Sequence, residues 1–322
     1  MRRVHYRTDM ADERVDEYKK VNNLTDLEGV EVVQDKKENS TVTTVNVLNE
    51  KGEESLSKKI GSYITVDTND IKYLEDEDEN KLVNVISDEI KKLIGSKSKT
   101  NLDSVLVVGL GNEYITPDAL GPKVVKNINI TRHVINLTKS LASSNVRSVS
   151  AIMPGVLGTT GIETYEIVKS VVDKIKPDIV IAIDSLASSS MHRIGNTIQL
   201  SNTGITPGAG VRNKREGLNE ENLNCPVIAI GVPTVVDMAT ITNEAIDKMV
   251  ENTKREIRDL ENIDDKNLEF FINFFSNEER YNMVANLLNS DSYILTPKEV
   301  DDLIEITSSI IGKSINLALD IV

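Results

Sequence analysis

The chain has 322 residues, of which 39% are hydrophobic, and this is enough to bury one large core or two modest ones. Its 37 Lys and Arg against 51 Asp and Glu give a formal net charge of -14, which argues against binding to nucleic acid or to anionic lipid. The single cysteine excludes a disulfide framework, and no apolar run approaches the ~20 residues of a membrane span. We therefore expect a protein of a reducing cytoplasm.

The first third of the sequence predicts a small β-element followed by a helix. Two runs are rich in Val, Ile, Thr and Tyr, namely 41–48 (TVTTVNVL) and 60–66 (IGSYITV). A turn signal, Glu50-Lys51-Gly52, lies between them. The acidic run 75–79 suits the first turn of a helix, and the apolar spacing from Lys81 to Ile94 continues it to a C-cap at Gly95.

From Ser104 onward the sequence is typical of an α/β core. Short, unbroken, mostly β-branched runs occur at 105–110 (VLVVGL), 179–183 (IVIAI) and 227–230 (VIAI). Strands that are apolar on both faces belong to parallel sheets covered by helices, and residues 162–175 have the spacing of such a helix. The alternation predicts a doubly wound, mainly parallel sheet.

The C-terminal part predicts helices. The phenylalanines Phe270, Phe271, Phe274 and Phe275 have helical spacing. Thr296-Pro297-Lys298-Glu299 reads as a capping box with proline at the first helical position.

Three glycine-containing loops, 109–114, 155–161 and 204–210, do not match a nucleotide fingerprint. Tyr114 stands where the third glycine of a dinucleotide motif would be, and no loop has the GK[ST] of a P-loop. They are therefore read as tight turns or as the backbone lining of a substrate cleft, with no cofactor expected. The candidate cleft residues are Gly111, Asn112, Gly155, Thr159, Thr160, Gly208 and Gly210.

Acidic side chains follow the predicted core strands. Asp118 lies in the loop after the first strand, Asp184 directly follows the second, and Asp237 follows the third. Ligands of open parallel sheets bind beyond the carboxyl ends of the strands, so these acids could form an acid/base pair or a metal site. For any one of them, a helix N-cap is the alternative. Cys225 is interpreted as a small buried hydrophobe.

Several segments resemble the germination protease family of endospore-forming bacteria. They are 105–127, 150–163, 176–188, 205–215 and 227–240, together with the N-terminal RTDMADE and the C-terminal LTPKEVDDLIE. The pattern GLGN…D…G is more weakly similar to hydrogenase-maturation endopeptidases, which implies that kind of α/β core.

The resemblance implies an endopeptidase that degrades small acid-soluble spore proteins in the spore core during germination. It also implies a homotetramer made as a self-processing zymogen, with catalytic aspartates at Asp118 and Asp184. Asp237 is a third, supporting acid on the strand-end argument alone. The segments expected on this basis are a propeptide (1–9), an N-terminal β/α segment (10–99), an α/β catalytic core (100–260) and a C-terminal helical segment (261–322).

Two neighbouring carboxyl groups would share one proton, so the ionised member could deprotonate water while the other donates to the scissile carbonyl. The rival is a metal held by the same acids. The hydrogenase-maturation endopeptidases hold a metal with such acids and add a histidine. In this sequence His192 is interpreted as a surface position, and His5 and His133 lie far from the acids in sequence. A non-enzymatic binding module on the same scaffold is a third reading.

The family's processing site is an acid, a large apolar residue, Ala, a small or polar residue and Glu. Residues 9–13 (DMADE) fit that pattern, with Asp12 its least regular position, so cleavage is expected between Asp9 and Met10. The released segment carries Arg2, Arg3 and Arg7, a cationic strip that would either block substrate or hold the aspartates ionised until acidification. An inert, disordered tail is the alternative.

Overall fold

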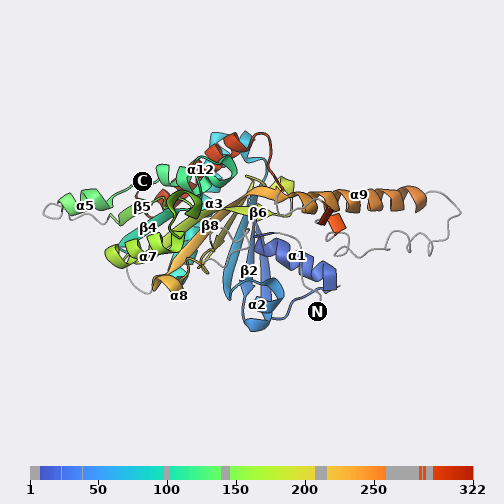
Figure 1. The fold of residues 1–322 in the computed structure, drawn as a ribbon, viewed down its shortest axis with the longest axis horizontal. Helices are drawn as coiled ribbons and strands as arrows, with labels where there is room; N and C mark the ends of the chain where they lie inside the picture. Colours follow the sequence, from blue (N-terminus) through green and yellow to red (C-terminus); the bar gives the residue numbers. More distant parts are fainter. Residues whose placement is uncertain are drawn as a thin grey trace.

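The computed structural model describes residues 8–22, 24–37, 39–97, 102–138, 146–206, 216–258, 283–284, 286–287 and 293–321 (Figure 1). The strands are β1 (Val30–Lys36), β2 (Ser40–Val47), β3 (Gly61–Thr68), β4 (Ser104–Gly109), β5 (Ser148–Ile152), β6 (Ile179–Ser188), β7 (Thr197–Ser201), β8 (Val227–Asp237) and β9 (Ile294–Leu295). The α-helices are α1 (Ala11–Asn22), α2 (Glu50–Leu56), α3 (Asp76–Lys97), α4 (Leu120–Lys126), α5 (Arg132–Thr138), α6 (Leu157–Thr160), α7 (Thr164–Ile175), α8 (Glu220–Leu223), α9 (Met238–Arg258) and α12 (Val300–Ala318). Short 3₁₀ turns are η1 (Ile71–Tyr73), η2 (Thr116–Asp118) and η3 (Met191–Arg193).

The strands form one nine-stranded sheet in the order β1-β2-β3-β7-β8-β6-β4-β5, with β9 on β8. The sheet has a parallel half, in which neighbouring strands pair in the order β5-β4-β6-β8. It also has an antiparallel half, in which neighbouring strands pair in the order β1-β2-β3-β7-β8. The α/β class is confirmed, but the sheet is mixed rather than mainly parallel. The reason is that β7 pairs antiparallel with β8 on one side and with β3 on the other. The predicted N-terminal β-element therefore becomes part of the same sheet. The segment boundaries stay a prediction.

Helices cover both faces of the sheet (Figure 1). One face packs against α3, α4 and α12, because strand side chains such as Ile179, Ile181 and Ile183 share that side. The alternate residues Val180 and Ala182 point to the other face, where α7 and the Leu223 end of α8 cover the parallel half. On the same face α1 and α2 cover the antiparallel half, over Val45 and Val47. Two separate groups of helices therefore stand on one face of the sheet.

The predicted strands and helices are largely confirmed, with local corrections. The turn signal at 50–52 is instead the start of α2, because the Asn49 side chain accepts from the backbone N–H groups of Lys51 and Gly52 and caps a helix. Gly95 does not end its helix, which continues to Lys97. Phe270, Phe271, Phe274 and Phe275 lie outside the described residues.

The last helix is present, but the predicted capping box is wrong. Helix α12 begins at Val300, and the hydroxyl of Thr296 donates 2.8 Å to the carbonyl of Thr234 instead of capping the helix. Strand β1 was not predicted, because its sequence VEVVQDK lies at the edge of the sheet with mostly exposed side chains and carries little apolar signal.

Candidate active site

Asp118 reaches the sheet through a tightly packed turn. It ends η2, just before α4, whose first turn contains Gly121. A Cβ on Gly121 would lie 2.3 Å from the carbonyl oxygen of Leu110 and 2.7 Å from that of Ile183. Only glycine allows α4 to approach β4 and β6 this closely, and this approach brings Asp118 beside the middle of β6.

Asp184 lies within strand β6 rather than at its end, because the strand continues to Ser188. Its side chain belongs to the face that Val180 and Ala182 occupy, and it is 8% exposed. Across the sheet Asp184 pairs with Gly231 of β8, which pairs in turn with Gln199 of β7. Since residues in register share a face, Asp184, Gly231 and Gln199 form one row, and the Leu186 side chain packs over Gly231 in the middle of it.

The environment favours protonation of both acids. Burial raises the pKa of Asp184 well above its ordinary value, and the nearby charge of Asp118 raises it further, although a 2.9 Å hydrogen bond from the Ser185 N–H opposes this. Burial also raises the pKa of Asp118, against the lowering effect of the Asn112 N–H. Both effects favour the protonated form, so the pair holds a proton more tightly than two isolated carboxyl groups would.

Gly111 shapes the loop around Asp118. Its φ is +104°, and a Cβ there would lie 2.1 Å from the carbonyl oxygen of Asp118. The Asn112 N–H donates to that same carbonyl at 3.0 Å. The glycine is therefore a requirement of the loop that positions Asp118, and not a phosphate-binding feature.

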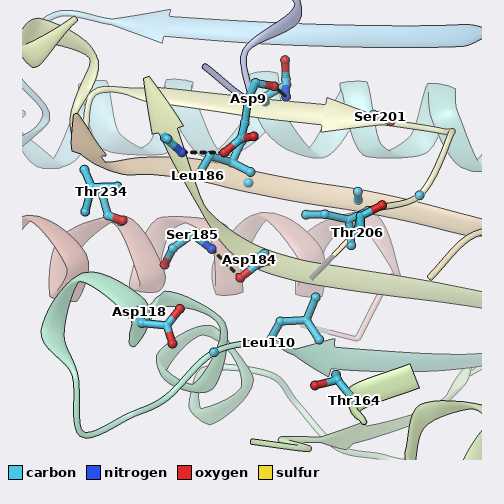
Figure 2. Close-up of a pocket in the computed structure, with 18 of the residues that line it drawn as sticks. Asp9, Leu110, Asp118, Thr164, Asp184, Ser185, Leu186, Ser201, Thr206 and Thr234 are labelled. Carbon is cyan, nitrogen blue, oxygen red and sulfur yellow. Dashed lines mark hydrogen bonds between the residues drawn. The ribbon is translucent and has the colours of Figure 1, made fainter. Parts of the chain in front are cut away.

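The two acids line a cavity of about 980 Å³ that lies between the two groups of helices. The chain's own segment Thr8–Asp9 also lines it. Asp9 is fixed to β6 on both sides, because its N–H donates 2.9 Å to the carbonyl of Ala187 and its carboxylate accepts from the Ala187 N–H at 2.8 Å. In the view of Figure 2, Asp184 lies between Asp118 and Asp9, and the charge of Asp9 also contributes to the raised pKa of Asp184.

The chain after Asp9 is anchored outside the cavity. Met10 and Ala11 are fully buried, and α1 begins at Ala11. Asp12 accepts two hydrogen bonds from Arg193, at 2.9 and 2.7 Å, and Glu13 accepts from the Ser188 hydroxyl at 2.7 Å. The residues that fit the processing pattern therefore lie partly in the cavity and partly in the core beside it.

The other predicted cleft residues divide into three groups. Gly111 and Gly155 line the cavity with Asp118 and Asp184. Asn112, Thr159 and Thr160 are not among its lining residues; the Thr160 hydroxyl, for example, donates to the Val156 and Ile162 carbonyls of its own turn. Gly208 and Gly210 lie outside the described residues, as do Arg2, Arg3 and Arg7.

Asp237 lies apart from the two acids. It ends β8, beyond Gly231 in the direction of the strand, and its carboxylate accepts from the Thr240 hydroxyl at 3.3 Å. It is not among the residues lining the cavity. Lys58 and Gln199 do line it, although neither was predicted from the sequence. No local motif marks either residue, because each reaches the cavity through the β3–β7–β8 pairing.

The donor set does not resemble a protein-held metal centre. Among the described ranges, no group of three or more His, Cys, Asp or Glu side chains gathers closely enough to hold an ion. His192 is exposed in η3 and is not a lining residue of the cavity, as the surface interpretation predicted. Cys225 is buried, which confirms its reading as a small core residue. In the part of the chain that the structure describes, no helix combines the length and apolarity needed to cross a bilayer.

Comparison with known proteins places the chain among the peptidases. A family model described as germination protease matches residues 6–281. The germination proteases of Clostridium perfringens (strain SM101 / Type A) and Clostridium acetobutylicum are 44% and 43% identical to it, each over 97% of this chain and 94% of the relative. That of Bacillus cereus (strain ATCC 10987 / NRS 248) is 38% identical over 91% of this chain and 87% of its own length. The chain belongs to the germination protease family.

Proposed function

We propose that this protein is the endopeptidase that begins the degradation of small acid-soluble spore proteins during germination. Membership of the germination protease family supports a spore protease. The sequence resemblance supports four further parts of this proposal. They are the small acid-soluble spore proteins as substrates, the location in the spore core, the homotetramer, and a core like that of the hydrogenase-maturation proteases.

The proposed mechanism uses Asp118 and Asp184 as a dyad. The observation that carries it is the raised pKa of buried Asp184 beside Asp118, in a cavity lined by a segment of the chain itself. The ionised carboxylate would accept a proton from water, and the protonated one would supply a proton to the scissile peptide. Asp237, the third acid of the sequence-based prediction, does not line the cavity and takes no step in this mechanism.

The dyad is tested by replacing each acid with its amide. Asp118→Asn and Asp184→Asn should each lower turnover of a purified small acid-soluble spore protein by at least about 100-fold while the fold is retained, since each removes one partner of the acid/base pair. Asp237→Asn and the exposed Asp173→Asn serve as matched controls and should keep their turnover. Wild-type turnover in either dyad variant would exclude this mechanism.

A metal-assisted reaction at the same acids is the alternative mechanism. Catalytic zinc sites use three protein ligands. Three carboxyl groups line this cavity, those of Asp9, Asp118 and Asp184, but among the described residues no three such side chains are placed to hold an ion together. Activity should therefore survive exhaustive chelation. Loss of activity on chelation, with recovery on adding a divalent cation, would favour the metal.

We also propose that the chain is a zymogen that cleaves itself between Asp9 and Met10. The support is that Asp9 is fixed by two hydrogen bonds to Ala187 at the edge of the cavity holding the dyad. Mildly acidic pH would favour the shared proton and hence processing. Mass spectrometry should detect loss of residues 1–9 in the wild type and not in Asp184→Asn; processing at another bond, or in both proteins, would contradict self-cleavage.

A further inference from the structure

The carbonyl oxygen of Asp9 accepts two hydrogen bonds from side chains that belong to different elements. The ammonium group of Lys58, just after α2, donates at 2.6 Å, and the side-chain amide of Gln199 donates through Nε2 at 3.1 Å. This is the carbonyl of the peptide bond between Asp9 and Met10. Both donors thus converge on the oxygen atom that would gain negative charge if water attacked that bond.

Gln199 recognises the chain on both sides of this bond. While its Nε2 donates to the Asp9 carbonyl, its Oε1 accepts from the N–H of Ala11 at 2.7 Å. The side chain is buried, so its amide is held in place rather than solvated. Gln199 therefore positions the peptide as a neighbouring strand would, with one donor and one acceptor.

The sheet register places this amide opposite the dyad. Gln199 and Asp184 both pair with Gly231, so they stand on adjacent sides of one strand, roughly 10 Å apart at the spacing of two strands. A Cβ on Gly231 would lie 2.5 Å from the Leu186 side chain, so Leu186 covers this position and forms the cavity floor between Gln199 and Asp184. A peptide that lies over Leu186 can face Gln199 on one side and Asp184 on the other.

Lys58 is desolvated where it meets the carbonyl. Burial lowers the pKa of its ammonium group, and the charge of Asp9 opposes that effect. The ammonium also lies 5.6 Å from the centre of the Tyr63 ring. A cation in such surroundings interacts more strongly with a developing oxyanion than a hydrated surface lysine would.

We propose that Lys58 and Gln199 form the oxyanion site of this enzyme. They bind the carbonyl oxygen of the residue before the scissile bond, on Asp9 during self-processing and on the equivalent residue of a protein substrate afterwards. The inference rests on the proposed function, because it takes the Asp9–Met10 bond as one that the dyad cleaves. Lys58 is then a catalytic residue, and Gln199 both binds the oxygen and positions the peptide.

This assignment changes the role of the dyad's proton. A carbonyl oxygen has two lone pairs, and Lys58 and Gln199 already use both. When the water oxygen bonds to the carbonyl carbon, the ionised carboxylate takes the water's proton and the two donors hold the negative oxygen. The protonated carboxyl then gives its proton to the Met10 nitrogen as the carbon–nitrogen bond breaks. The proton goes to the leaving amine and not to the carbonyl.

Substitutions of Lys58 test the inference. Lys58→Met keeps the apolar stem and removes the charge, and it should lower kcat about 100- to 1,000-fold with a much smaller change in KM. Lys51→Met, on the exposed side of α2, is the matched control and should behave as wild type. Gln199→Glu removes the Nε2 donor in a side chain of similar size and should slow both self-processing and turnover of a small acid-soluble spore protein.

The pH profile separates a charged donor from a structural lysine. Activity falls with rising pH as the dyad loses its shared proton, and loss of the Lys58 proton should add a further fall. Because the pKa of Lys58 is lowered, this further fall should begin below the ordinary lysine range of about 10.4. Lys58→Arg should move the further fall to higher pH, because arginine stays charged. If Lys58 had a purely structural role, the wild type and Lys58→Arg would lose activity over the same alkaline pH range.

The outcomes distinguish this inference from the function on which it rests. A wild-type protein that neither processes itself nor cleaves the spore-protein substrate overturns the proposed function, and the oxyanion site with it. An active wild type with an equally active and folded Lys58→Met overturns the oxyanion site alone. Thermal melting curves of each variant establish that the fold is retained.

Discussion

The contact between helix α1 and turn η3 depends on Arg193. Its guanidinium group donates twice to Asp12 and lies 3.5 Å from carboxylate oxygens of both Glu13 and Asp67. Asp12 and Glu13 are 7% and 9% exposed, so substitution of the arginine leaves two buried carboxylates without their cation. Breaking a buried pair by removing one partner costs about 3–5 kcal/mol, and we expect Arg193→Met to lower the free energy of unfolding by that amount.

Urea denaturation followed by circular dichroism measures this loss. The control is Lys123→Met, which also breaks an ion pair between distant segments, but one whose side chains are 29% and 70% exposed. An exposed pair contributes about 0–1 kcal/mol, so the two variants should differ clearly. Adding Asp12→Asn to Arg193→Met should restore part of the loss, because one unpaired carboxylate is removed. A loss below about 1 kcal/mol in Arg193→Met would refute the reasoning.

Other properties of single residues lead to further predictions. The raised pKa of Asp184 means that the folded state holds this proton more tightly than the unfolded state does, so the wild type loses stability as the pH rises above about 4. Asp184→Asn should therefore be more stable than the wild type at neutral pH but not in acid. Urea denaturation at a series of pH values measures the difference. Gly121→Ala should cost about 1–3 kcal/mol through its clash with β4, whereas Gly95→Ala, with open space around it inside α3, should gain about 0.5–1 kcal/mol in the same assay. Burial raises the pKa of the Cys225 thiol to about 11, so a thiol reagent should label it only in denaturant, and labelling of the native protein would contradict its burial. With a net charge of -14 the protein should not shift duplex DNA in a mobility assay at physiological salt, and a salt-sensitive shift would contradict this.

The sequence predicts the parallel part of the sheet best, because strands that are covered on both faces must be apolar along their whole length. The run at 105–110 therefore matches β4 to within one residue at each end, and the run at 179–183 matches the first half of β6. Asp118 and Asp184 followed from the same rule, since the acids near the carboxyl ends of adjacent parallel strands meet at one edge. The structure brings these two together in one cavity.

What the sequence does not contain is how far each strand continues. Asp184 and Asp237 follow similar apolar runs, yet the first lies in mid-strand beside Gly231, and the second lies at the end of β8 against the Thr240 hydroxyl. Lys58 and Gln199 were equally hidden. They come together only because β3 pairs with β7, and that long-range pairing depends on the packing of the complete sheet.

The pairing of β3 with β7 also means that the site is divided between two stretches of the chain. Lys58 precedes α3, while Asp118, Asp184 and Gln199 all follow it. A chain cut between α3 and β4 would yield one piece with Lys58 and another with Asp118 and Asp184, the proposed dyad. Peptidase activity on mixing the pieces would then report their reassembly through the β3–β7 edge, which makes this enzyme a natural starting point for a split-protein sensor.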